Sequence, residues 1–137
     1  MRAVVDANVL IATVLSSRGA PAELLRSARD GAFELIVSEL VITELDRALA
    51  YPKLRKRISA EQAASFIGWL RDHGTVAEDP VDPPPVTSPD PDDDYLLALA
   101  VKERAYLVTG DHHLLGVSDE LPIHQPAEFL RIVSQTR

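Results

Sequence analysis

The sequence predicts an α/β fold in which a central, mostly parallel sheet lies between two layers of helices, a three-layer α/β/α arrangement. Short apolar runs alternate along the chain with longer segments of helical periodicity, which is typical of parallel strands joined by helical crossovers. The 137 residues amount to roughly one domain. No internal repeat is evident, so residues 1–137 are interpreted as a single domain.

The predicted strands are short and rich in β-branched residues. Ala3–Val5 is such a run and ends at Asp6, and Phe33–Val37 is an apolar run of similar length. The other predicted strands are Thr75–Ala77, Tyr106–Val108 and Pro122–Ile123. In parallel sheets, ligands bind at the carboxyl ends of the strands, so residues that follow these runs are candidate site residues.

The predicted helices begin and end at residues typical of helix caps. Ser38 suits the N-cap of a helix that runs to about Ala50, and Pro21 suits the first turn of one that ends near Asp30. The remaining helical segments are Val9–Leu15, Ala60–Arg71, Asp92–Arg104, the short turn His112–Leu115 and Ala127–Val133. Within Asp92–Arg104, the segment Leu96–Val101 is apolar on every side, which predicts burial.

Composition excludes several kinds of function. The absence of cysteine rules out disulfides, thiolate metal sites and a cysteine nucleophile, and it suits a cytoplasmic location. No segment is long and apolar enough to span a membrane, and Asp6 and Asn8 interrupt the apolar start that a signal peptide needs. The net charge of −7 argues against nucleic-acid binding, because phosphate contacts need Lys and Arg. A bound Mg²⁺ would cancel part of that charge locally.

Four acids lie where the predicted topology would bring them to one crevice. Asp6 and Asp111 follow strands, Glu44 lies in the helix after the second strand, and Asp93 lies at the start of a late helix. Each also has a structural explanation. Asp6 and Asp111 suit helix N-caps, acids such as Asp93 are favoured in the first turn of a helix, and Glu44 could be a solvated residue on the flank of its helix. Four carboxylates in one pocket need a cation, and Mg²⁺ or Mn²⁺ suits such hard oxygen ligands.

Helical periodicity locates Glu44 more clearly than it locates Asp93. Helical phase puts Glu44 at the edge of an inward stripe and turns Arg47 away, which predicts a partly buried carboxylate. Asp92, Asp93 and Asp94 follow one another, with Asp90 as the expected N-cap, and phase cannot choose among them because the helix beyond is apolar all round.

Four segments contain the candidate acids and their neighbours. They are Val5-Asp6-Ala7-Asn8-Val9-Leu10, Ser38-Glu39-Leu40-Val41-Ile42-Thr43-Glu44-Leu45, Asp90-Pro91-Asp92-Asp93-Asp94-Tyr95-Leu96-Leu97-Ala98-Leu99-Ala100 and Leu107-Val108-Thr109-Gly110-Asp111. In this order they resemble the PIN-domain family, and specifically its small bacterial members that are toxins of toxin–antitoxin pairs (VapC-like). The resemblance covers the chain from Val4 to about Phe129. Each segment alone is a weak signal, and the order and spacing of the four are fairly specific.

The resemblance implies a PIN-like fold and a metal-dependent endoribonuclease with catalytic, metal-binding acids at Asp6, Glu44, Asp93 and Asp111. Asp93 matches by its distance from the apolar run that follows, and Asp92 or Asp94 could assist. Asn8 and Thr109 match positions that support the acids. The resemblance also implies an RNA substrate, Mg²⁺ or Mn²⁺ as cofactor, a cognate antitoxin protein and a homodimer.

Other interpretations of the sequence remain. An α/β domain with acids at strand ends could be a phospho-accepting receiver or a phosphatase, although Asn8 stands where an Asp-x-Asp phosphatase needs an acid. A non-catalytic module could bind RNA or an antitoxin without cutting. His112 and His113 lack a third histidine nearby for a zinc site. The basic run Lys53, Arg55, Lys56 and Arg57 is either an RNA-facing patch or a solvated loop and helix start.

Overall fold

The computed structural model describes residues 1–136, and at its centre is a five-stranded sheet with every strand parallel to its neighbours. The strands lie in the order β3-β2-β1-β4-β5. Their bounds are β1 (Arg2–Val5), β2 (Glu34–Ser38), β3 (Thr75–Ala77), β4 (Tyr106–Val108) and β5 (Ile123–His124). The predicted fold class is therefore confirmed, and the sheet is parallel throughout.

The helices follow the predicted segments closely. They are α1 (Ala7–Leu15), α2 (Ala20–Arg29), α3 (Glu39–Leu49), α4 (Pro52–Arg55), α5 (Ala60–His73), α6 (Asp94–Glu103), α7 (His112–Leu115) and α8 (Pro126–Gln135), with the 3₁₀ turn η1 (Pro91–Asp93) before α6. Ser38 caps α3, as expected, by accepting a hydrogen bond from the backbone N–H of Val41. The sequence analysis missed α4. None of the helices in residues 1–136 has the length and hydropathy needed to cross a lipid bilayer.

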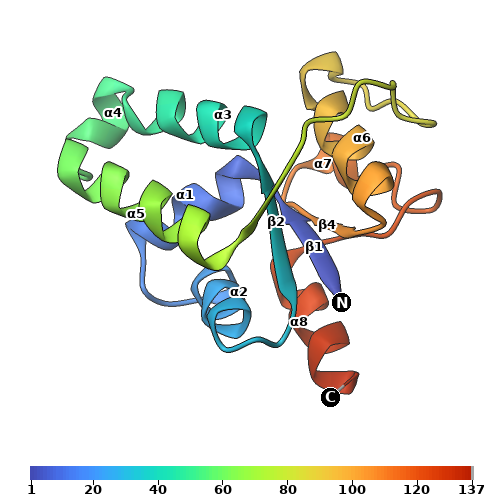
Figure 1. Ribbon diagram of the computed structural model, residues 1–137, viewed down its shortest axis with the longest axis horizontal. Coiled ribbons are helices and arrows are strands. Elements are labelled where there is room, and N and C mark those ends of the chain that lie inside the picture. Colours follow the sequence, from blue (N-terminus) through green and yellow to red (C-terminus); the bar gives the residue numbers. More distant parts are fainter. Residues whose placement is uncertain (137) are drawn as a thin grey trace.

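The order of the strands in the sheet determines where a ligand crevice is expected. From β1 the chain adds β2 and then β3 on one side, and afterwards returns to add β4 and β5 on the other side. Because crossovers between parallel strands are right-handed, α1, α2, α3 and α5 cover one face and α6 and α7 the opposite face (Figure 1). The order reverses between β1 and β4, and the crevice at the carboxyl ends of these two strands is the expected ligand site.

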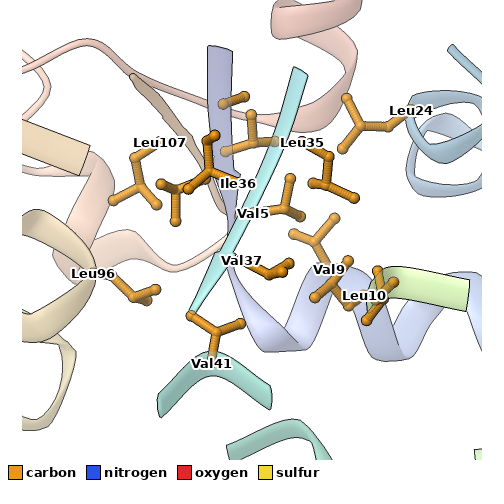
Figure 2. Packing of buried hydrophobic residues seen from close by; sticks show 14 of the residues in the cluster. Val5, Val9, Leu10, Leu24, Leu35, Ile36, Val37, Val41, Leu96 and Leu107 are labelled. Carbon is orange, nitrogen blue, oxygen red and sulfur yellow. The ribbon is translucent and has the colours of Figure 1, made fainter. Parts of the chain in front are cut away.

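A single hydrophobic core holds these layers together. Val4 in β1 pairs with Ile36 on one side and Leu107 on the other, and all three are fully buried. Figure 2 shows Leu96 and Leu107 on one side of the central strands and Leu24 on the other. The predicted burial of the middle of α6 is correct for Leu96–Ala100 and wrong for Val101, which lies in the last turn of the helix and is 40% exposed.

The proline-rich segment before η1 has no regular structure, as its composition predicts. Two contacts attach the start of this segment to helices on either side of the crevice. The Asp79 carboxylate accepts a hydrogen bond from the backbone N–H of Leu40 in α3 at 3.1 Å, and the Lys102 ammonium in α6 donates to the backbone carbonyl of Glu78. The start of the segment is therefore attached both to the first turn of α3 and to the last turn of α6.

Candidate active site

Asp6 is the first residue beyond β1, and its carboxylate is buried, with 7% of the residue exposed. Its backbone N–H donates to the carbonyl of Val108, which continues the pairing of β1 with β4. One carboxylate oxygen accepts a hydrogen bond from the N–H of Asn8 and caps α1, and the other accepts one from the Thr109 hydroxyl at 2.8 Å. Asp6 is therefore the N-cap of α1, as its structural explanation predicts, and its side chain is also fixed at the crevice.

Asp111 lies three residues beyond the end of β4. Its carboxylate caps α7 by accepting a hydrogen bond from the N–H of His113 at 2.7 Å. Its own N–H donates to the Thr109 hydroxyl at 3.1 Å, and that hydroxyl donates to Asp6. One threonine side chain thus connects the acids that follow the two central strands.

The three consecutive aspartates face different surroundings. Asp90 is the N-cap, as expected, and accepts a hydrogen bond from the N–H of Asp92 at 3.0 Å. The Asp94 carboxylate accepts a hydrogen bond from the backbone N–H of Ser88 at 2.9 Å, so it is engaged in the proline-rich segment. Asp92 and Asp93 instead line the cavity described below. The structure therefore separates Asp94 from the other two.

Glu44 lies on α3 with 44% of its side chain exposed, so the predicted partial burial is confirmed. It forms an ion pair with Arg47, one turn further along the helix. Arg47 faces away from the core, as helical phase predicts, with 63% of its side chain exposed. Its long side chain nevertheless reaches back toward Glu44 and lines the same cavity, because phase fixes only the direction of the Cα–Cβ bond.

Three of the four predicted acids, Asp6, Glu44 and Asp93, line one cavity of about 640 Å³ at the carboxyl edge of the sheet. Asp111 is not part of its lining but lies close enough for its charge to act on Asp6 and Asp93. Tyr51 and Tyr95 also line the cavity, and the sequence analysis did not single them out. The signals that could have found them are the helix break at Tyr51-Pro52 and the position of Tyr95 directly after the aspartate run.

The acids of the cavity shift one another's ionisation. Burial, opposed by the hydrogen bond from Thr109 and reinforced by the charge of Asp111, raises the pKa of the Asp6 carboxyl. Burial and then the charges of Asp111 and Asp6 raise the pKa of Asp93 to about 6. Burial, followed by the charge of Glu44, also raises the pKa of the Tyr95 phenol, which therefore stays protonated at neutral pH. Burial is thus the largest cause of the raised pKa at all three groups, and the negative charges of neighbouring acids add to it.

The donor set fits a hard divalent cation in chemistry. It consists of carboxylate oxygens, which Mg²⁺ and Mn²⁺ prefer, and a cation would relieve the repulsion that raises the pKa of Asp6 and Asp93. As arranged in residues 1–136, no three His, Cys, Asp or Glu side chains converge closely enough to form a ligand group. The assignment of Asp6, Glu44, Asp93 and Asp111 as metal ligands therefore stays a prediction.

The predicted residues outside the cavity have simple surroundings. His112 and His113 are exposed on α7, and the His113 ring nitrogen lies 3.7 Å from the Asp111 carboxylate. Neither histidine lines the cavity. Lys53 and Arg55 lie on α4 and Lys56 and Arg57 directly follow it, so the basic run begins just beyond Tyr51.

The sheet is parallel throughout, and an acid-lined cavity lies where its strand order reverses. This combination defines an α/β protein whose site is suited to cation-assisted chemistry. The family model described as "PIN domain" matches residues 2–113, and the chain belongs to this family, whose members are generally metal-dependent nucleases. This membership favours the nuclease interpretation over a receiver or phosphatase.

One relative and two solved structures are similar to this chain over most of its length. An uncharacterised protein of Methanocaldococcus jannaschii is 25% identical over 140 residues, which covers 95% of this chain and 90% of that protein. The crystal structure of PAE2754 from Pyrobaculum aerophilum is similar with a TM-score of 0.64 at 19% identity, covering 98% of this chain and 90% of that one. The structure of VapBC2 from Rickettsia felis, bound to a DNA fragment from its promoter, gives a TM-score of 0.62 at 14% identity and covers 91% and 98%. At these identities the solved structures show a shared fold.

Proposed function

We propose that this chain is a metal-dependent endoribonuclease that hydrolyses RNA phosphodiester bonds and serves as the toxin of a toxin–antitoxin pair. The observation that carries the proposal is the shared cavity of Asp6 and Asp93 in a PIN-domain chain, where each carboxyl has a raised pKa. Carboxylates that repel one another in one pocket are the arrangement expected of a site for divalent cations.

In this proposal Asp6 and Asp93 are the main ligands, and Asp111 and Glu44 complete or position the site. A bound Mg²⁺ or Mn²⁺ would supply an activated water and would neutralise charge on the phosphate. The chain's own contribution begins with Thr109, whose hydroxyl holds the Asp6 carboxylate in one orientation. Asn8 lies in the lining of the cavity, where its exposed side chain is available to position water or substrate.

Two further side chains supply what a phosphodiester substrate needs. Arg47 places a guanidinium in an otherwise acidic cavity, and it can transfer its hydrogen bonds from Glu44 to a phosphate oxygen. Tyr95 presents a phenol that remains protonated and can donate a hydrogen bond to the same group. Hydrolysis then adds water across one P–O bond, with cavity carboxylates accepting hydrogen bonds from the attacking water.

The toxin assignment and the partners rest on similarity. VapBC2 of Rickettsia felis, which has the same fold, is described as bound to DNA from its promoter. We propose by analogy that this chain is held by a cognate antitoxin protein that covers the acidic cavity, and that it forms a homodimer.

The decisive test is cleavage of RNA by the purified, antitoxin-free protein. A mixture of single-stranded and structured RNA is incubated with Mn²⁺ or Mg²⁺, with and without EDTA. We expect cleavage that EDTA and the Asp6→Asn substitution both abolish. Asp46→Asn on α3 is the matched control, because Asp46 is exposed and does not line the cavity. A folded protein that binds RNA but cuts none with either metal would instead be a non-catalytic binding module.

A further inference from the structure

The acidic character of this chain makes the distribution of its positive charge informative. Six Arg and Lys side chains form ion pairs with acids, namely Arg2, Arg26, Arg29, Arg47, Arg71 and Lys102. Lys53, Arg55, Lys56 and Arg57 are exposed and make no such pair within residues 1–136. Pairing thus cancels positive charge over much of the surface and leaves these four cations together.

This group of four cations, the α4 basic run, lies next to the acid-lined cavity. Figure 1 shows α3 leading from the end of β2 to α4. Arg47 and Tyr51, near the end of α3, both line the cavity, and Pro52 starts α4 directly after Tyr51. A strand leaving the cavity past Tyr51 therefore meets the α4 basic run within about one helical turn.

Tyr51 is held as an exposed aromatic platform between the cavity and the run. The proline that follows disfavours helical backbone at Tyr51, and its φ of −62° and ψ of 140° are the extended values expected before a proline. Its N–H donates to the carbonyl of Ala48 in α3, and its carbonyl accepts from the N–H groups of Leu54 and Arg55. The backbone is thus fixed on both sides while 57% of the residue is exposed.

We propose that Tyr51 and the α4 basic run form the binding track for single-stranded RNA beside the cavity, with Tyr51 stacking on an unpaired base and the cations contacting phosphates. This inference rests on the proposed ribonuclease function and names the form of RNA that the site accepts. Aromatic side chains combined with a basic groove are the usual means of binding single strands without reading sequence. A base inside a duplex is already stacked and paired, so Tyr51 selects unpaired segments.

The track also resolves the objection raised by the net charge of −7. An acidic protein repels RNA at long range, but a local concentration of unpaired cations attracts the strand and steers it to one edge of the molecule. The carboxylates then lie at the end of the track rather than in its path. RNA supplies a phosphate for each cation and a base that can stack on Tyr51, so a single strand satisfies both parts of this surface at once.

Binding is measured separately from cleavage, by fluorescence anisotropy with a labelled single-stranded RNA in EDTA, on protein that carries Asp6→Asn. Into this background we introduce Arg55→Gln/Arg57→Gln, and as matched control Arg18→Gln/Arg131→Gln, which removes the same charge from exposed positions elsewhere. The first pair is expected to weaken binding about 10-fold at moderate salt and to reduce the salt slope by about 1.4, since each single-strand phosphate contact contributes about 0.7. The control pair is expected to change neither.

Tyr51→Ala tests the stacking part. It is expected to weaken single-stranded binding by about 5- to 100-fold with little change in salt slope, and to remove the preference over a duplex of the same length. Poly-L-glutamate serves as a polyanion without bases, and the unsubstituted track should bind it at least 10-fold more weakly than the RNA. Three results would each refute the track. They are an equal loss of RNA affinity in the two double arginine variants, equal affinity of the parent for poly-L-glutamate and RNA, and a Tyr51→Ala variant that still prefers single-stranded RNA over the duplex.

These outcomes are distinct from failure of the proposed function. A protein that cuts RNA with metal, yet binds it equally well with and without the α4 cations, refutes the track and leaves the ribonuclease intact. A protein that binds through the track but cuts nothing refutes the ribonuclease and leaves the track.

Discussion

The Thr109 hydroxyl donates a hydrogen bond to the Asp6 carboxylate at 2.8 Å, between two buried side chains that are 103 positions apart in the sequence. The same hydroxyl accepts a hydrogen bond from the N–H of Asp111, so its proton is directed toward Asp6. This contact fixes the orientation of the most buried acid of the site and relates it to the neighbouring strand end.

Replacing Thr109 with valine keeps the shape of the side chain and removes the hydroxyl. We expect the pKa of Asp6 to rise further, because the hydrogen bond that lowers it is lost. Cleavage at low metal concentration should fall by roughly 10- to 100-fold, as is usual when a partner that orients a ligand is removed. The measurement is the initial rate as a function of Mn²⁺ concentration. Thr109→Ser should restore most of the rate, and a valine variant as active as the parent at every concentration would refute this role.

Asp93→Asn should stabilise the metal-free fold at neutral pH while it abolishes cleavage. The folded pKa of about 6 lies above the unfolded value of 3.8, so the folded state binds more protons and the free energy of unfolding decreases as pH rises from about 4 to about 6. The shift corresponds to at most about 3 kcal/mol, and solvent screening at this partly exposed group reduces it to about 1 kcal/mol.

Thermal unfolding in EDTA measures this effect. Asp93→Asn is expected to raise Tm at pH 7.5 by about 4 °C, and the gain should shrink as the pH is lowered through about 6 and vanish below about 4, where the parent carboxyl becomes protonated in both states. Asp46→Asn should leave Tm nearly unchanged at both pH values. A Tm gain in Asp93→Asn that is independent of pH would show that charge repulsion is not its cause.

The three consecutive aspartates should separate in a cleavage assay. Asp93→Ala is expected to abolish cleavage and Asp92→Ala to reduce it, because both side chains line the cavity. Asp94→Ala should retain cleavage but lose about 1 kcal/mol of stability, since its carboxylate holds the backbone N–H of Ser88. Activity is scored with Mn²⁺ and stability by urea denaturation. Loss of cleavage in a folded Asp94→Ala variant would move the site assignment by one residue.

Arg104 should be a position where glycine stabilises the protein. It is the one non-glycine residue with positive φ in residues 1–136, at φ 51° and ψ 49°, where it ends α6. Left-handed backbone is strained for residues with a Cβ and costs about 1 kcal/mol, so Arg104→Gly should increase the free energy of unfolding by about 0.5–1 kcal/mol. Urea denaturation measures this gain, and Arg131→Gly inside α8 should lose about 1 kcal/mol instead.

Local signals were enough to predict nearly all strands and helices. Periodicity found the long helices, and the cap residue Ser38 fixed the start of α3 to within one position. The short helix α4 was missed because Tyr51-Pro52 reads as a stop, and Pro52 is equally suited to begin a new helix.

The site was predictable only in part, because its details depend on contacts that periodicity does not contain. Position alone identified Asp6 and Asp111, which follow strands. The choice among the three aspartates depends on Ser88, which lies in an irregular segment and takes Asp94 as its partner. The places of Arg47 and Tyr51 depend on how α3 ends beside the cavity, and no local pattern encodes that.

The pairing of β1 with β4 has a consequence for synthesis of the chain. Asp6 leaves the ribosome 103 residues before Thr109, which follows β4 directly, and Asp111 comes after both. Contacts between such distant segments form late and slowly, because the intervening chain must first be closed into a loop. A nascent chain therefore cannot assemble the acidic cavity before Asp93 has been translated, and under the proposed ribonuclease function a product that stops earlier would leave RNA intact.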